Sequence, residues 1–327
     1  RDLHSFPTRR SSDLPGYRRK ERNRHLTCNT DHRKKVTRGR LILLMSLLAA
    51  FWGMSFFGSN VALKYMNTFQ ILSVRWTISM FIFIFLIVTG KVKLRIDENL
   101  PWLLATGILQ PCLYSICETE GVRLTSTSET SIFIAAIPGT VLLTGILFFK
   151  KKSNYRITLG IILAFAGVVV CTAFAPGFRI GAKVTGYPVL IAAVLCGAFY
   201  AHFSGKAGEK HGTLEVTAAI SISGGIFFNI ISLVTGNGFT GFSECLKHRE
   251  ALLAVLFLGV FCSCICYLIF NYVLANMNTA VASNISASSA TAIGVMSGVL
   301  LAGDPGGWFT VAGLALTISG LWLSGSR

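Results

Sequence analysis

Long apolar segments dominate the chain, and short polar or glycine-containing stretches separate them. A helix rises about 1.5 Å per residue, so roughly 20 apolar residues cross a hydrocarbon layer about 30 Å thick. Ten segments fit this length: Leu41–Ala62, Phe69–Thr89, Leu100–Gly121, Ser128–Phe149, Ile157–Ala175, Tyr187–Ser204, Leu214–Val234, Leu252–Leu274, Val281–Ala302 and Trp308–Ser324. Because spanning helices satisfy their own backbone hydrogen bonds, the pattern predicts an all-α membrane protein with ten transmembrane helices.

The two halves of the chain resemble copies of one another. A shift of 153 residues matches residues in segments of the same ordinal position, namely Gly145 with Gly298, Gly160 with Gly313, Gly167 with Gly320 and Tyr114 with Tyr267. We therefore predict two five-helix repeats, residues 41–175 and 187–324. Since five is an odd number, the second repeat is expected to enter the membrane upside down, and inverted repeats of this kind usually build a substrate site at their interface.

Composition supports a membrane chain. Hydrophobic residues make up 52% and charged residues 13%, whereas soluble domains carry about 25% charged residues. The formal net charge is +16, but residues 1–40 alone hold 13 Lys and Arg against 4 Asp and Glu. Nine cysteines are present, most of them inside apolar segments. These features argue against a nucleic-acid-binding domain, a disordered protein and a disulfide-stapled secreted module.

Residues 1–40 form a basic head that we expect to be disordered, because its few apolar residues cannot bury enough surface to fold. The chain starts at Arg1, and the stretch DLHSFPTRRSSDL resembles a spurious translated leader. The alternative is a genuine basic arm that binds anionic lipid headgroups. No signal peptide is expected, because no short apolar core precedes a small-residue cleavage site.

The distribution of Lys and Arg predicts orientation. With the N-terminus inside, ten of these residues fall in inner loops or at the C-terminus and six in outer loops, without the head. The bias predicts that both termini are cytoplasmic. We expect the protein to lie in the plasma or inner membrane.

Polar stripes on the third and eighth segments are the main candidates for a substrate path. Gln110, Tyr114 and Glu118 recur at intervals of four and therefore share one helix face. Their equivalents 153 residues further on are Ser263, Tyr267 and Asn271. We expect the stripes to line the path, with Glu118 towards the outside and Asn271 towards the inside. The alternative is that they only join helices by hydrogen bonds.

Arg75 and Glu118 lie at similar depth in the second and third segments. A charge in the membrane costs at least ~2.5–3.5 kcal/mol on insertion scales, so an Arg75–Glu118 ion pair is expected. The pair could bind the carboxylate and amine of a zwitterion, and Glu118 is the candidate proton-coupling residue. The alternative is a structural pair, or an Arg75 that reaches the headgroups.

Aromatic residues add to this picture. Trp52 lies inside the first segment and is a candidate wall for apolar substrates, as is Tyr200 in the sixth. Trp76, Trp102, Trp308 and Trp322 lie nearer the ends of segments and fit an interfacial belt.

Several stretches resemble EamA-type proteins of the drug/metabolite transporter superfamily. They include AFWGMSFFGSNVALK, LSVRW, ETEGVRLTSTSETSIFIAAIPG, LFFKKKSNYRITLGIILAFAGVVV and VLLAGDPGGWFTVAGLALTISGLWL. The family usually places a glutamate after its fourth and ninth helices, whereas this chain has Lys151 and Asp304. The resemblance implies a secondary transporter that exports small metabolites, amino acids or drugs by alternating access. The alternative is a sensor or scaffold on a transporter fold.

Enzyme chemistry finds little support in the sequence. Cys262, Cys264 and Cys266 are spaced by two, and no His pair completes a metal site with them. No P-loop motif is present, which argues against ATP-driven pumping by this chain. We therefore expect no catalytic residue, metal or cofactor, and the expected partners are a small-molecule substrate and the lipid bilayer. Protons are the candidate coupling ion, and a homodimer is a candidate assembly.

Overall fold

The structure is a computed structural model that describes residues 38–95, 100–124, 133–176, 185–297, 299–300 and 306–325. Arg1–Leu41 and Ile42–Arg327 form two separate units, and the helical bundle belongs to the second. Within the described residues all regular structure is helical, so the all-α prediction is confirmed. Most of the predicted basic head, and Gly298 and Asp304, lie outside these residues.

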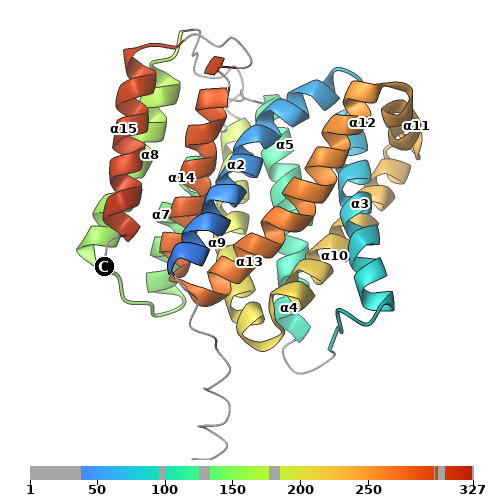
Figure 1. Cartoon of the computed structure of the whole chain (residues 1–327), viewed down its shortest axis with the longest axis horizontal. Helices are drawn as coiled ribbons and strands as arrows, with labels where there is room; N and C mark the ends of the chain where they lie inside the picture. The colour runs from blue at the N-terminus through green and yellow to red at the C-terminus, as the bar shows by residue number, and fades with distance from the viewer. Residues whose placement is uncertain are drawn as a thin grey trace, which may run out of the picture. The chain divides into compact units, whose positions relative to one another are not determined.

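Each of the ten predicted segments contains a helix (Figure 1). In chain order the first predicted repeat contains α2 (Arg38–Leu63), α3 (Thr68–Val88), α4 (Leu100–Gly107), the π-helical segment η2 (Ile108–Tyr114), α5 (Ser115–Leu124), α7 (Ile137–Leu147) and α8 (Tyr155–Ala173). The second contains α9 (Gly186–Lys210), α10 (Thr213–Val234), α11 (Thr240–Lys247), α12 (Arg249–Leu256), the π-helical segment η3 (Phe257–Ile265), α13 (Cys266–Asn276), α14 (Thr279–Ser297) and α15 (Trp308–Gly325).

Seven of the described helices are long and apolar enough to cross a membrane. Two shorter apolar helices, Phe133–Leu147 and Tyr155–Cys171, fall in the fourth and fifth predicted segments. The protein is therefore a multi-pass membrane protein. Two features differ from prediction: α9 continues to Lys210, because Ala, Glu and Lys favour helix, and α11 is a short helix too polar to be found as a span.

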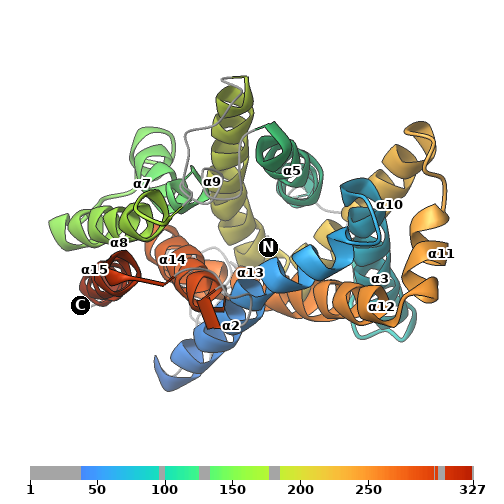
Figure 2. The same ribbon diagram turned by 90° about the horizontal axis from the view of Figure 1, so that it is seen from above.

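Helices α8 and α15 form the most extensive contact between described elements, and they lie side by side in Figures 1 and 2. A Cβ on Gly160 would lie 2.6 Å from the Gly320 carbonyl oxygen, and one on Gly167 would lie 2.5 Å from that of Gly313. An early residue of α8 thus meets a late residue of α15, so the helices are antiparallel. Small residues allow two membrane helices to approach this closely.

Helices α3 and α10 form a second antiparallel pair. A Cβ on Gly224 of α10 would lie 2.9 Å from the Trp76 ring of α3. The Ser79 and Ser221 hydroxyls are 2.8 Å apart, and the Ser73 hydroxyl donates to the side-chain oxygen of Asn229 at 3.0 Å. This pair therefore combines a glycine-lined contact with hydrogen bonds, which satisfy polar groups that hydrocarbon cannot.

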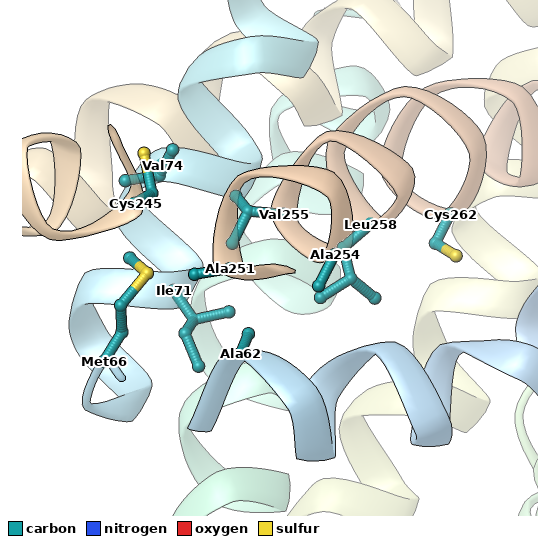
Figure 3. Close-up of a cluster of buried hydrophobic side chains, with 10 residues drawn as sticks. All are labelled: Ala62, Met66, Ile71, Val74, Cys245, Ala251, Ala254, Val255, Leu258 and Cys262. Carbon is teal, nitrogen blue, oxygen red and sulfur yellow. The ribbon is translucent and has the colours of Figure 1, made fainter. Parts of the chain in front are cut away.

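A hydrophobic cluster fixes the end of the bundle where α2 leads into α3. Figure 3 shows side chains from α2, α3, α11 and α12–η3 pointing towards one another. The buried members are Ala62, Met66, Ile71, Val74, Cys245, Ala251, Ala254, Val255, Leu258 and Cys262. Cys245 comes from α11, so the cluster helps to anchor this short helix against α3 and α12, together with the hydrogen bond from the Gln70 side chain to Thr240 at 2.7 Å.

The glycine contact between α8 and α15 makes a prediction about stability. Gly160→Ala should lower the free energy of unfolding by about 1–3 kcal/mol, because the new methyl group meets backbone atoms that cannot move aside. The control is Gly139→Ala, whose Cβ would meet only Ile161, at 3.8 Å. Denaturant unfolding of the purified chain in detergent measures both variants, and equal stability would contradict this packing.

Candidate functional site

The third and eighth predicted segments each contain a π-helical stretch, η2 and η3. Moving η2 by 153 residues places it over residues 261–267, which overlap η3. Pro111 lies inside η2 and has no backbone N–H to donate, which disrupts the regular hydrogen-bond ladder there. Both halves therefore carry irregular backbone at equivalent places, and π-helical turns are frequent at functional sites.

Tyr267 joins the polar residues of the two halves. Its phenol oxygen accepts a hydrogen bond of 2.5 Å from the Gln110 side chain, which lies on η2. The Tyr267 ring packs edge-on against Trp52 with centroids 5.6 Å apart, and it contacts Trp76 at 5.5 Å and Tyr200 at 6.4 Å. Gln110 and Tyr267 are both 6% exposed. The structure thus brings together three predicted path residues, Trp52, Gln110 and Tyr267.

Trp52 has a second contact with the eighth segment. Its indole nitrogen donates to the Cys262 carbonyl oxygen at 3.3 Å, and the Cys262 thiol donates to the Phe51 carbonyl oxygen at 3.4 Å. The freed carbonyl groups of a π-helical segment need such partners in a membrane. Trp52 therefore couples α2 to η3 as well as facing Tyr267.

Arg75 and Glu118 both belong to the described residues, and they do not form the expected ion pair. The Arg75 Nε donates to the Ser263 hydroxyl at 2.5 Å, whereas Glu118 Oε1 accepts from the Tyr114 hydroxyl at 2.9 Å. Tyr114 is the last residue of η2 and Glu118 lies in the first turn of α5, so this bond runs from the π-helical segment into regular helix. Gln110 lies earlier in η2 and is bonded to Tyr267 of α13 instead.

Asn271 occupies a different environment from the rest of the stripe. Its amide oxygen accepts from the Tyr200 hydroxyl at 2.6 Å and the Ser204 hydroxyl at 2.7 Å, and its amide nitrogen donates to Thr217 at 2.9 Å. Asn271 is fully buried, so both ends of its amide are used inside the protein. These bonds join α9, α10 and α13. Sequence reasoning missed Thr217 and Ser204 because hydroxyl residues are too common in membrane helices to stand out.

Trp76 is not at a membrane interface, so its assignment to an aromatic belt is wrong. It is 1% exposed and lies between Tyr267 and Gly224. The guanidinium of Arg75 lies 5.8 Å from the centre of its ring. Counting from the segment end misplaced it: Trp76 is eight residues into the 21-residue helix α3, near its middle.

Lys151 stands where the resembled family has a glutamate, and its amino group lies in a polar cluster. Lys151 Nζ donates to Thr279 at 2.8 Å and faces His202 Nδ1 at 3.4 Å. His202 Nε2 lies 3.0 Å from the Val141 carbonyl oxygen, which only accepts, so the ring proton is assigned to Nε2. Burial of the amino group lowers the pKa of Lys151, although Glu209 acts in the opposite direction and Lys206 adds to the lowering. This cluster joins α9, α14 and the residues after α7.

Comparison with known proteins fits this architecture. The family model described as the EamA-like transporter family matches residues 39–173 and 184–326. An uncharacterized transporter of Archaeoglobus fulgidus is 25% identical over 86% of this chain and 97% of its own length. The uncharacterized transporter YcxC of Bacillus subtilis is 26% identical over 82% of this chain and 87% of its own.

A solved structure titled only as a crystal structure of a protein superposes with a TM-score of 0.74 at 15% identity, covering 88% of this chain and 97% of that one. At this identity the likeness shows the fold alone. The two family matches together cover nearly the whole described bundle. The chain therefore belongs to the EamA-like transporter family, and it is a membrane transporter rather than an enzyme.

Proposed function

We propose that the protein is a secondary transporter that exports small metabolites, amino acids or drugs across the cell membrane by alternating access. The observation that carries this proposal is the hydrogen bond between Gln110 and Tyr267, which links the first family match to the second in the middle of the bundle. A non-transporting scaffold has no need for such buried polar groups at the meeting place of two repeats. That argument favours transport over the alternative of a sensor or scaffold.

We propose further that the matches form two inverted repeats of five spanning helices each. The glycine contacts support this arrangement. Gly160 and Gly313 are equivalent under the 153-residue shift, as are Gly167 and Gly320. Gly160 contacts Gly320, the equivalent of Gly167, and Gly167 contacts Gly313, the equivalent of Gly160. A two-fold axis produces this pattern: where a residue at one position of the first copy contacts a second position of the other copy, the second position of the first copy contacts the first position of the other.

In this proposal the solute binds near the midplane, where inverted repeats meet. The residues that line its path are Trp52, Arg75, Gln110, Tyr114, Glu118, Ser263 and Tyr267. Asn271 also belongs to the equivalent stripe, but its three internal hydrogen bonds favour a role in joining helices. We place the protein in the plasma or inner membrane with both termini in the cytoplasm, on the bias of Lys and Arg among the loops. A homodimer is a proposed assembly.

Glu118 is the proposed site of proton coupling. It is only partly buried, and its hydrogen-bond partner among the described residues is the neutral Tyr114 hydroxyl rather than a cation. A carboxylate without a fixed counter-ion can take up and release a proton as the solute passes.

Glu118→Gln should abolish accumulation driven by a pH gradient, because the amide cannot exchange a proton. Exchange of solute without a gradient should persist, and the yield of folded protein should not change. The measurement uses proteoliposomes, with and without a pH gradient, after a solute screen on the unaltered protein. Glu120→Gln is the control. Full gradient-driven activity of Glu118→Gln would rule out this role.

Asn271→Ala should lower the free energy of unfolding by about 1–3 kcal/mol, because it leaves buried hydroxyl groups on α9 and α10 without their partner. The solute flux per folded molecule should stay close to that of the unaltered protein. A double-mutant cycle with Tyr200→Phe measures the shared hydrogen bond, for which membrane proteins give about 0.6 kcal/mol on average. A large loss of flux with unchanged stability would instead place Asn271 in the path.

A further inference from the structure

Two neighbouring donors in the centre of the bundle have no acceptor among the described residues. Trp76 is 1% exposed, and its buried indole N–H makes no hydrogen bond to the described residues. Arg75 is half-buried and donates its Nε to the Ser263 hydroxyl, and its terminal guanidinium nitrogens make no hydrogen bond within the described part of the chain. A buried polar group is normally paired, so the unpaired indole N–H of Trp76 calls for an explanation, and a group that is bound there at some stage would supply one.

The surrounding contacts fix which edge of the indole is free. A Cβ on Gly224 would lie 2.9 Å from both Cδ2 and Cε3 of Trp76, so the six-membered ring of the indole faces α10. The indole nitrogen is bonded to Cδ1 and Cε2, so it is not among the ring atoms that lie nearest to Gly224. Arg75 lies 5.8 Å from the centre of the ring and Tyr267 packs 5.5 Å away.

The charges near these donors limit what can bind. Arg75 supplies one positive charge, which interacts electrostatically with Glu118, Tyr114 and Tyr267. With Glu118 protonated, Arg75 balances a group with one negative charge, whereas a group with two negative charges exceeds the single positive charge nearby. A guanidinium fork binds a carboxylate through parallel N–H bonds, and one further N–H donor suits its remaining lone pairs.

We infer that Arg75 and the Trp76 indole N–H bind a carboxylate of the transported solute. The inference rests on the proposed transport function and narrows its substrate class to carboxylic acids and zwitterions, to the exclusion of simple amines. Arg75 supplies charge, and Trp76 supplies one directed hydrogen bond. Because Trp76 and Tyr267 are almost completely buried, the carboxylate reaches them when the bundle opens.

The first part of the test requires no variant. Proteoliposomes containing the full chain are offered three matched sets of radiolabelled probes: α-amino acids, the carboxylic acids that lack the amino group, and the amines that lack the carboxylate. We expect saturable uptake of amino acids or acids and none of the amines. Uptake of amines at the same rate as acids would overturn the carboxylate site and leave transport intact. Failure of every probe to move, when another solute from the screen is transported, would also overturn the carboxylate site. Failure of all solutes in the screen would instead contradict the proposed transport function.

The second part removes only the N–H. Trp76→Phe keeps an aromatic ring against Tyr267 and Gly224, and it should raise the KM for the transported carboxylate roughly tenfold or more with little change in maximal rate. Trp322→Phe is the matched control, since Trp322 is 73% exposed on α15. A KM equal to that of the unaltered protein in folded Trp76→Phe would overturn the assignment. A fall in maximal rate alone would do the same, because a purely structural role produces that result.

Discussion

A polar side chain in the middle of a membrane bundle must find its partner within the protein, because hydrocarbon offers none. In this chain that requirement is met mainly by bonds between helices that are distant in sequence. Tyr267 accepts a hydrogen bond from Gln110, and Ser263 accepts one from Arg75. Asn271 accepts hydrogen bonds from the hydroxyls of Tyr200 and Ser204. The bonds of Tyr267 and Ser263 join the two family matches to one another, whereas those of Asn271 lie within the second match.

Two kinds of contact between the halves have different consequences for movement. Between α8 and α15 the backbones approach one another at glycines, and the side chains beside them are the small ones of Cys171, Thr317 and Ser324. Around Tyr267 the contact consists of single hydrogen bonds and ring edges, which can be exchanged for bonds to a solute or to water. In the proposed cycle the glycine contact holds the repeats together while the polar contact opens and closes. The π-helical segments lie beside the polar contact, where the backbone ladder is already irregular.

Much of the architecture follows from the sequence. Apolar length locates a helix in every predicted segment, because the thickness of the hydrocarbon layer fixes the number of residues required. The 153-residue shift also picked out Gly160, Gly167, Gly313 and Gly320, which the structure places in contact with one another. Small residues at such a crossing are a strong signal, since any side chain there meets backbone.

The contacts between the site residues could not be predicted from the sequence, and the reasons are geometric. Spacing by four assumes regular α-helix, and the π-helical turn at Pro111 breaks that assumption between Gln110 and Tyr114. Equal depth suggested an ion pair between Arg75 and Glu118, but depth says nothing about the direction in which each side chain leaves its helix. Trp76 was assigned by its distance from a segment end, whereas its burial depends on Gly224, a residue of another helix.

The central claim is that the contact between Gln110 and Tyr267 is the place where the path opens alternately to the two sides. The most direct measurement introduces Gln110→Cys into a chain whose native cysteines are replaced by serine, and it applies a membrane-impermeant thiol reagent from either side. The account predicts labelling from both sides, and protection by the transported solute in each case. Labelling from neither side, or from one side only under all conditions, would contradict it.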